Sequence, residues 1–206
     1  MHAVFVDGPA GAGKTTWADG LSAGLGVPVV HMDDLYLGWS GLEGAFYRLE
    51  ELVLAPLSAG QTAAFKAYDW TMDSKTAGAD PAQQPPPKPA NLVLFGESSG
   101  LSGPGLAAKA GQSSGSTPGA FRVIEPCEWL VVEGCGCAPR AAQRWIDTLV
   151  WLDGPWPLRR TAVVERDGAA SEPEIDRWEL ATQQHFEREQ TRQRADLKLE
   201  RGGRQP

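Results

Sequence analysis

The sequence predicts an α/β fold of three layers, in which a parallel five-stranded sheet is flanked by helices. Short apolar runs that end in acidic residues, such as 129–133 and 148–153, recur along the chain, and this pattern is typical of buried parallel strands. Segments with the apolar spacing of amphipathic helices, such as 42–57, lie between the runs. A glycine-rich stretch at 8–15 joins the first apolar run to a helical segment. Strands that alternate with helices in this way favour a parallel sheet.

The glycine-rich stretch fits the phosphate-binding pattern G-x-x-x-x-G-K-[ST] at every fixed position. An apolar strand at 3–6, which ends at Asp7, precedes it, and a helix can continue from Thr16, so both parts of the context that the pattern requires are present. Small residues allow successive backbone N–H groups to point at phosphate oxygens, and the helix start adds its positive dipole end. Lys14 can reach the β- and γ-phosphates, and the Thr15 hydroxyl can bind Mg²⁺.

We therefore expect a nucleoside triphosphate site at this loop. The alternative is a glycine-rich turn without a ligand, which the flanking strand and helix disfavour. The residues expected to bind the nucleotide are Gly8, Pro9, Ala10, Gly11, Ala12, Gly13, Lys14, Thr15 and Thr16.

Composition restricts the class of protein. The 206 residues suit one domain with a sizeable core, and the formal net charge of -7 argues against a broad nucleic-acid footprint. Met1 leads directly into the first strand, so we expect no signal peptide, and no apolar run approaches the length of a membrane span. Three cysteines make a poor disulfide framework and fit a reducing cytoplasm. For Cys135-Gly136-Cys137 we favour loop residues over a metal or redox pair, because few histidines accompany them.

Two adjacent acids follow the second predicted strand, at 27–31, in the segment Met32-Asp33-Asp34-Leu35-Tyr36. Ligands bind outside the C-terminal strand ends of open α/β sheets, and this point is expected one strand away from the phosphate loop. One acid could accept the proton of an attacking hydroxyl, and the other could reach Mg²⁺ through water. A helix N-cap acid with a solvated neighbour is the alternative.

An aromatic–acid–aromatic trio, Tyr68-Asp69-Trp70, ends the predicted strand at 63–67. It could stack on a planar substrate and bind its hydroxyls; packing of both aromatics in the core is the alternative.

The composition changes over 71–122, which holds 7 of the 16 prolines and a run rich in Gly and Ser. We expect a mobile insertion there, because such a segment buries too little apolar surface to offset its ordering entropy. Within it, only 91–95 could form a strand or an anchor. The run Pro85-Pro86-Pro87 could instead be a ligand for a proline-binding module.

The last third of the chain offers two acids, Glu133 and Asp153, each at the end of a predicted central strand and each a candidate to lie near a metal. A helix is predicted over 156–167, on which Arg159 and Arg166 lie on one face; they could converge on a transferring phosphoryl group or form a solvated basic face.

The spacing of apolar residues from Ile175 to His185 predicts a further amphipathic helix. Ser171 and Glu174 have the spacing of a capping box, and His185 is interpreted as a packed or surface residue. A last strand is expected at 196–200, followed by a frayed tail at 201–206.

Together these segments resemble the uridine kinase-like branch of the P-loop kinases, from Val4 to about Glu200. The resemblance rests on five segments in order: the loop at 8–15, Met32-Asp33-Asp34-Leu35-Tyr36, Tyr68-Asp69-Trp70, Val131-Val132-Glu133-Gly134, and Arg159-Arg160 with Arg166-Asp167.

The resemblance implies a single P-loop NTPase domain over 1–206 with a short arginine-bearing lid. It implies a kinase that uses ATP and Mg²⁺ to phosphorylate a hydroxyl of a small molecule, foremost a nucleoside such as uridine or cytidine. The resemblance implies that Asp33 is the general base and that Lys14, Arg159 and Arg166 are also catalytic. It implies that Arg160 lies near the nucleotide. It also implies a metal site formed by Thr15, Glu133 and Asp33. The order of elements in this family is the reason that we prefer Glu133 to Asp153 as the metal-binding acid. The acceptor contacts are Asp34, Tyr36, Trp39, Tyr68, Asp69 and Trp70.

One departure bears on the acceptor: Gly38-Trp39-Ser40-Gly41-Leu42 stands where uridine kinases carry an acidic, His- and Pro-containing motif that binds the ribose. Nucleoside monophosphates, vitamin precursors and sugars therefore stay open as acceptors. A second class of function is an ATP-binding regulatory NTPase whose insertion binds a partner. A guanine-specific switch is excluded, because the only asparagine, Asn91, is followed by Leu92 and not by lysine.

Overall fold

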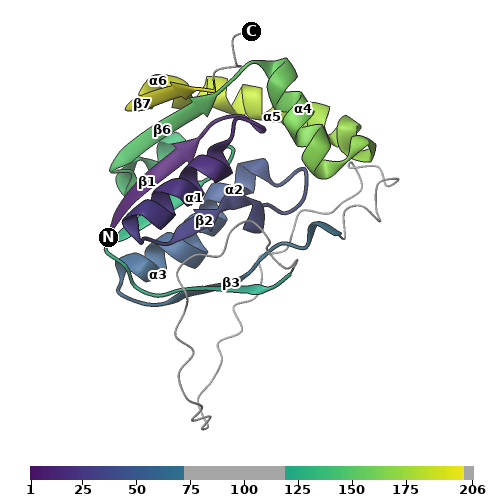
Figure 1. Cartoon of the computed structure of the whole chain (residues 1–206). Helices are drawn as coiled ribbons and strands as arrows, with labels where there is room; N and C mark the ends of the chain where they lie inside the picture. Colours follow the sequence, from purple (N-terminus) through teal and green to yellow (C-terminus); the bar gives the residue numbers. More distant parts are fainter. Residues whose placement is uncertain (72–118, 202–206) are drawn as a thin grey trace.

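The computed structural model describes residues 1–71 and 119–201 (Figure 1). The proposed anchor at 91–95, the proline run and most of the predicted insertion lie outside these residues.

Five strands form a parallel sheet in the order β2-β5-β1-β6-β7, which confirms the predicted fold class. The strands are β1 (His2–Asp7), β2 (Val29–His31), β5 (Trp129–Glu133), β6 (Thr148–Asp153) and β7 (Leu197–Glu200). In the register, Glu133 lies beside Val6 and His31, and Asp7 lies beside Trp151. The acids at the strand ends therefore meet along one edge of the sheet.

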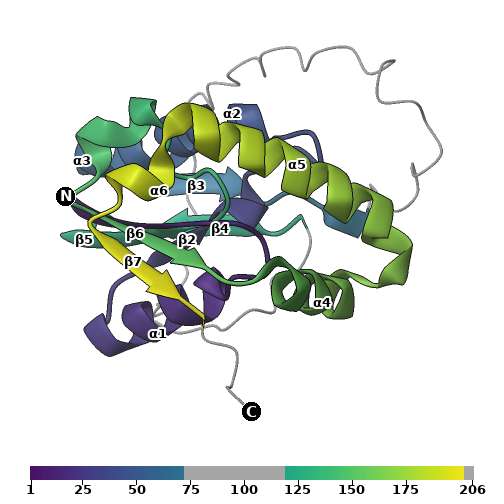
Figure 2. The ribbon, with the colours of Figure 1, turned by 90° about the horizontal axis from the view of Figure 1, so that it is seen from above.

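Alternate residues of each central strand face opposite layers, which explains why these strands are apolar throughout. Phe5 and Val132 belong to the core beneath α2, α3 and α5, whereas Val6 and Val131 pack with α1. Figure 2 shows α5 across one face of the sheet and α1 across the other. A three-layer domain results.

The helices that cover the sheet match the predicted segments closely. They are α1 (Lys14–Leu25), α2 (Leu42–Leu49), α3 (Ala55–Ser58), α4 (Trp156–Asp167), α5 (Glu172–Glu189) and α6 (Thr191–Arg194). A π-helical segment (Glu50–Leu54) joins α2 to α3, so that the predicted helix at 42–57 is continuous, and its apolar face (Leu42, Phe46, Leu49, Val53 and Leu57) is buried. Within the two described ranges, no helix has both the length and the apolar character that a membrane span requires.

The strand predicted at 63–67 exists as β3 (Ala63–Lys66), but it lies outside the parallel sheet. It pairs antiparallel with β4 (Phe121–Ile124), which begins inside the segment predicted as an insertion. Ala63 and Phe65 are buried while the residues between and after them are exposed. This half-buried alternation is typical of an antiparallel strand with one solvated face, unlike the fully apolar central strands.

The predicted capping box at the start of α5 is absent. Ser171 makes no side-chain cap, and its hydroxyl donates to the carbonyl of Asp167 at 3.2 Å. Its backbone closes a 3₁₀ turn at Ala169–Ser171, with φ of -91° and ψ of 2°, and so lacks the extended conformation of a typical N-cap. The spacing of Ser171 and Glu174 alone was therefore misleading.

Asp7, at the end of β1, connects the two loops that follow the central strands. Its fully buried carboxylate accepts hydrogen bonds from the backbone of Gly8 (2.7 Å), Gly136 (2.7 Å) and Ala138 (3.0 Å). Burial raises the pKa of this carboxyl, although the three N–H donors and the charge of Lys14 oppose the shift. The start of the glycine-rich loop is thereby fixed to the turn after β5.

We expect Asp7→Asn to lower the free energy of unfolding by about 2–4 kcal/mol, because an amide has one acceptor oxygen and would turn its NH₂ toward a backbone donor. Denaturant unfolding measures this loss. Asp176→Asn, at an exposed site on α5, serves as the control and should change stability by less than about 1 kcal/mol. Equal effects in the two variants would contradict the bridging role.

Candidate phosphate-loop site

The loop between β1 and α1 is shaped by glycines in conformations that other residues rarely adopt. Gly8, Gly11 and Gly13 have φ of 143°, 76° and 91°. A Cβ at Gly8 would lie 1.9 Å from the carbonyl oxygen of Leu152, and one at Gly11 would lie 2.3 Å from that of Arg159. The loop is thus packed at backbone level against the end of β6 and the first turn of α4, and α1 begins directly behind it.

Lys14 lies across this loop and is almost fully buried. Its ammonium donates to the carbonyl of Pro9 at 2.9 Å and to the sulfur of Cys135 at 3.4 Å. Burial alone would lower the pKa of Lys14, but the charges of Cys135, Glu133 and nearby aspartates outweigh burial and raise it. The lysine is therefore a protonated cation among acids.

Thr15 and Glu133 converge as predicted for a metal site. The Thr15 hydroxyl donates to Oε1 of Glu133 at 3.1 Å, and the Glu133 side chain is buried. Asp153, the competing acid, instead accepts from the backbone N–H of Gly154 at 2.7 Å. This geometry favours Glu133 over Asp153.

His31 is a member of this cluster that the sequence analysis missed. Its Nδ1 lies 2.7 Å from Oε1 of Glu133, and its Nε2 lies 3.5 Å from Oδ1 of Asp19. Burial would lower the pKa of His31, yet the hydrogen bond and charge of Glu133, with the charge of Asp19, raise it overall. His31 lies at the end of β2, and the register of the sheet places it beside Glu133.

Asp33 and Asp34 lie in a 3₁₀ turn (Met32–Asp34) after β2 and have different partners. Burial by the surrounding protein raises the pKa of the Asp33 carboxyl, although its residue is solvent-accessible; Glu133 adds to the shift, and Arg166, Lys14 and His31 oppose it. These interactions place Asp33 within electrostatic range of Lys14 and Arg166. The N-cap position of this turn is His31, so neither acid occupies it.

Asp34 points instead toward the β3–β4 hairpin. Its carboxylate accepts two hydrogen bonds from Arg122, at 2.7 and 3.0 Å, and its backbone carbonyl accepts the N–H of Tyr68 at 2.9 Å. Asp34, which was predicted to contact the acceptor, therefore binds the β3–β4 hairpin to the turn after β2.

An aromatic cluster adjoins Asp33. The indole of Trp70 donates to the carbonyl of Asp33 at 2.9 Å, and Trp39 packs edge-on against Trp70 and Trp178 with ring centroids 5.5 and 6.1 Å apart. Trp178, from α5, was not anticipated. Tyr36 is 2% exposed and donates to the carbonyl of Cys135 at 2.7 Å, so this predicted acceptor residue is part of the core.

Tyr68 and Asp69 complete the predicted acceptor set. Tyr68 stacks edge-on against Trp70 at 5.2 Å, and Asp69 accepts hydrogen bonds from the backbone and hydroxyl of Thr71 at 3.1 and 2.6 Å. Tyr68 and Trp70 thus pack against each other, and Trp70 also lies beside Asp33. Core packing and a place next to the candidate site, the two alternatives for this trio, therefore occur together.

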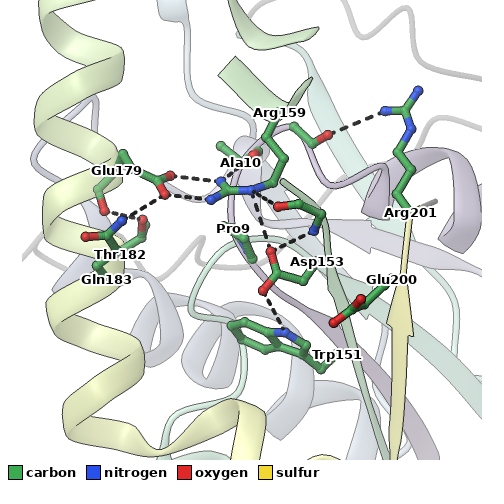
Figure 3. Close-up of polar contacts among 12 residues, drawn as sticks. Pro9, Ala10, Trp151, Asp153, Arg159, Glu179, Thr182, Gln183, Glu200 and Arg201 are labelled. Carbon is green, nitrogen blue, oxygen red and sulfur yellow. Dashed lines mark hydrogen bonds and ion pairs between the residues drawn. The ribbon is translucent and has the colours of Figure 1, made fainter. Parts of the chain in front are cut away.

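The three lid arginines do not converge. Arg166 lies close enough to Asp33 for their charges to interact, and it is held by Asp167 at 2.6 and 2.8 Å. Arg160 pairs with Glu172 and Asp176 on the surface of α5. Arg159 is buried against Glu179 behind the loop (Figure 3). Seven residues correspond to about 10 Å along a helix, so Arg159 and Arg166 share a face but not a site.

Arg201 belongs to the loop region and not to a frayed tail. Its Nη1 donates to the carbonyl of Gly11 at 3.5 Å, and Figure 3 shows its side chain extending over the loop from the end of β7. The prediction of a tail is wrong at this residue; residues 202–206 lie outside the described ranges.

The structure is a three-layer α/β domain of P-loop NTPase type: a parallel sheet with a glycine-rich loop after β1, acids at the neighbouring strand ends and an arginine-bearing helix after β6. A solved structure described as a possible uridine kinase from Bacillus stearothermophilus is similar over 97% of this chain and 88% of its own, with a TM-score of 0.56 and 16% identity. A crystal structure of a Thermus thermophilus protein matches over 98% of this chain and 90% of its own, with 17% identity and a TM-score of 0.40. No family model and no curated protein matches the sequence.

We expect Gly11→Ala to destabilise the domain by about 2–4 kcal/mol, because the new methyl group would meet the Arg159 carbonyl in a strained backbone conformation. Gly20→Ala is the matched control: nothing lies within 4 Å of the added Cβ, so this helical site should gain about 0.5–1 kcal/mol. Thermal and denaturant unfolding show whether each substitution raises or lowers the free energy of unfolding. A neutral Gly11→Ala would contradict the close packing of loop and α4.

Proposed function

We propose that this protein is an ATP- and Mg²⁺-dependent kinase that transfers the γ-phosphoryl group to a hydroxyl of a small molecule. The observation that carries the proposal is the convergence of Lys14, the Thr15–Glu133 pair and Asp33 at one edge of the sheet. Phosphoryl transfer depends mainly on positioning and charge neutralisation, and these groups provide a cation, oxygen ligands and a base.

The nucleotide fits the loop, because its positive-φ glycines and the start of α1 form a cradle that a Cβ at Gly8 or Gly11 would disrupt. Lys14 would release the carbonyl of Pro9 and bind phosphate oxygens instead. Arg166, on the lid helix, would approach the transferring group from the side of Asp33.

Magnesium also fits, since a hydroxyl and a carboxylate lie side by side at Thr15 and Glu133, and Mg²⁺ prefers oxygen ligands supplied by few protein groups. The described residues contain no cluster of three or more His, Cys, Asp or Glu side chains suited to a metal. Once bound, the ion would neutralise phosphate charge. His31 would orient the Glu133 carboxylate toward it.

Asp33 would serve as the general base. Its charge interacts with those of Lys14 and Arg166, the two cations that would hold the transferring group, so the carboxylate would lie beside the attacking hydroxyl. The partly exposed rings of Trp39 and Trp70 beside it would contact a planar acceptor. A nucleoside such as uridine or cytidine is our first candidate, supported by the likeness to a possible uridine kinase and by the aromatic wall.

ATP consumption measured against nucleosides, nucleoside monophosphates, pantothenate and sugars tests this proposal. With the preferred acceptor, Asp33→Asn should lower kcat by about two to four orders of magnitude while ATP still binds. Asp34→Asn is the matched comparison; it should mainly lower stability, because it breaks the pair with Arg122. Undiminished turnover in Asp33→Asn would remove Asp33 from the mechanism.

Glu133→Gln should raise the Mg²⁺ concentration needed for half-maximal activity by about tenfold or more, because a neutral amide is a weaker ligand. The matched control is Asp153→Asn, which changes the competing acid at the end of the next strand. A magnesium titration at saturating ATP measures both. A larger shift in Asp153→Asn would reverse the assignment of the metal-binding acid.

A further inference from the structure

Arg159 holds the loop from outside the phosphate cradle. Its Nη1 donates to the carbonyl of Ala10 at 3.1 Å, and its Nε donates to the carbonyl of Gly154 at 2.9 Å. Two further bonds join the guanidinium to the Glu179 carboxylate at 3.0 and 2.8 Å, as Figure 3 shows. One side chain therefore connects the phosphate loop, the end of β6 and α5.

Burial, an aromatic ring and the Glu179 carboxylate together fix the orientation of this guanidinium. The side chains of Arg159 and Glu179 are each 8% exposed, and the ring of Trp156 lies 5.1 Å from the guanidinium carbon. Gln183 donates to the same carboxylate at 3.1 Å. A planar, bidentate pair of this kind cannot be replaced by a lysine without loss of geometry.

The same residue also links the loop to the lid helix at backbone level. The carbonyl of Arg159 occupies the space that a side chain at Gly11 would need, and Pro155 and Pro157 stiffen the first turn of α4. Arg166 lies two turns further along this helix and interacts with the charge of Asp33. A shift at the first turn of α4 would thus displace both the loop and Arg166.

We infer that Arg159 is a positioning residue: through Glu179 and the Ala10 carbonyl it fixes the phosphate loop and aims the lid helix that carries Arg166. This inference deepens the proposed function. The expected effect on phosphoryl transfer rests on that function, whereas the expected effect on MgATP affinity requires only that the loop binds a nucleotide. It replaces the earlier expectation that Arg159 contacts the phosphoryl group.

A cavity of about 350 Å³ borders this ion pair on the side of α5, lined in part by Pro9, Asp153, Glu179 and Gln183. Because this cavity is open to solvent and part of its lining is polar, water can fill the space that a shortened side chain leaves. Variants of Arg159 should therefore fold, which allows the inference to be tested.

Isothermal titration of MgATP into Arg159→Lys and Glu179→Gln should show affinity weakened about tenfold in each variant. The double variant should be no weaker than either single one, because both changes remove the same support. Arg177→Lys, the same chemical change at an exposed arginine of α5, should bind as the wild type does. Additive losses, or unchanged affinity in Arg159→Lys, would overturn the inference.

A second variant separates positioning from stability. Replacing the buried pair by apolar residues, Arg159→Met with Glu179→Leu, should keep the unfolding midpoint near that of the wild type and still weaken MgATP binding about tenfold, since the bond to Ala10 is gone. Full affinity in this variant would contradict the role. If the wild type binds MgATP but phosphorylates no acceptor, the proposed function fails while these binding results still decide the inference.

Discussion

The buried carboxylate of Asp7 is the interaction on which the rest of the site depends. It receives N–H groups from the start of the phosphate loop and from the turn after β5, so two loops from neighbouring strands share one acceptor. The turn after β5 also contains Cys135, whose sulfur accepts a hydrogen bond from Lys14. The position of the loop lysine is thereby tied to the sheet through buried polar contacts, each of which would be costly to leave unpaired.

Three carboxylates, those of Glu133, Asp7 and Asp33, act on the ammonium of Lys14 at this edge of the sheet. Glu133, Asp33 and Asp7 raise the pKa of Lys14, and Glu133 raises that of His31, each against the effect of burial. Such an arrangement stabilises cations at this edge. In the proposed reaction, Lys14, the backbone N–H groups and a divalent ion would together offset these carboxylates, which is our reason for including magnesium in the proposal.

The parts of the site that could be predicted are those whose signal is local in the sequence. The phosphate loop is contiguous, and Asp33 and Glu133 each follow an apolar strand whose end is fixed by the sheet. His31, Trp178 and Arg201 reach the site only through strand register or long-range packing, for which no short pattern exists. Arg159 shows the same limit, because its partner Glu179 lies on another helix, and the hairpin was missed because β4 follows residues of low complexity.

The β3–β4 hairpin has a consequence for how the domain is built. The N–H of Ala67 bonds to the carbonyl of Ala120, and a Cβ at Gly119 would lie 3.7 Å from that of Asp69. The two described residues that flank the gap, Thr71 and Gly119, therefore belong to segments that lie side by side. A tight turn of a few residues would be long enough to join these segments, so the geometry of the hairpin by itself sets no lower limit on the length of sequence between its two strands.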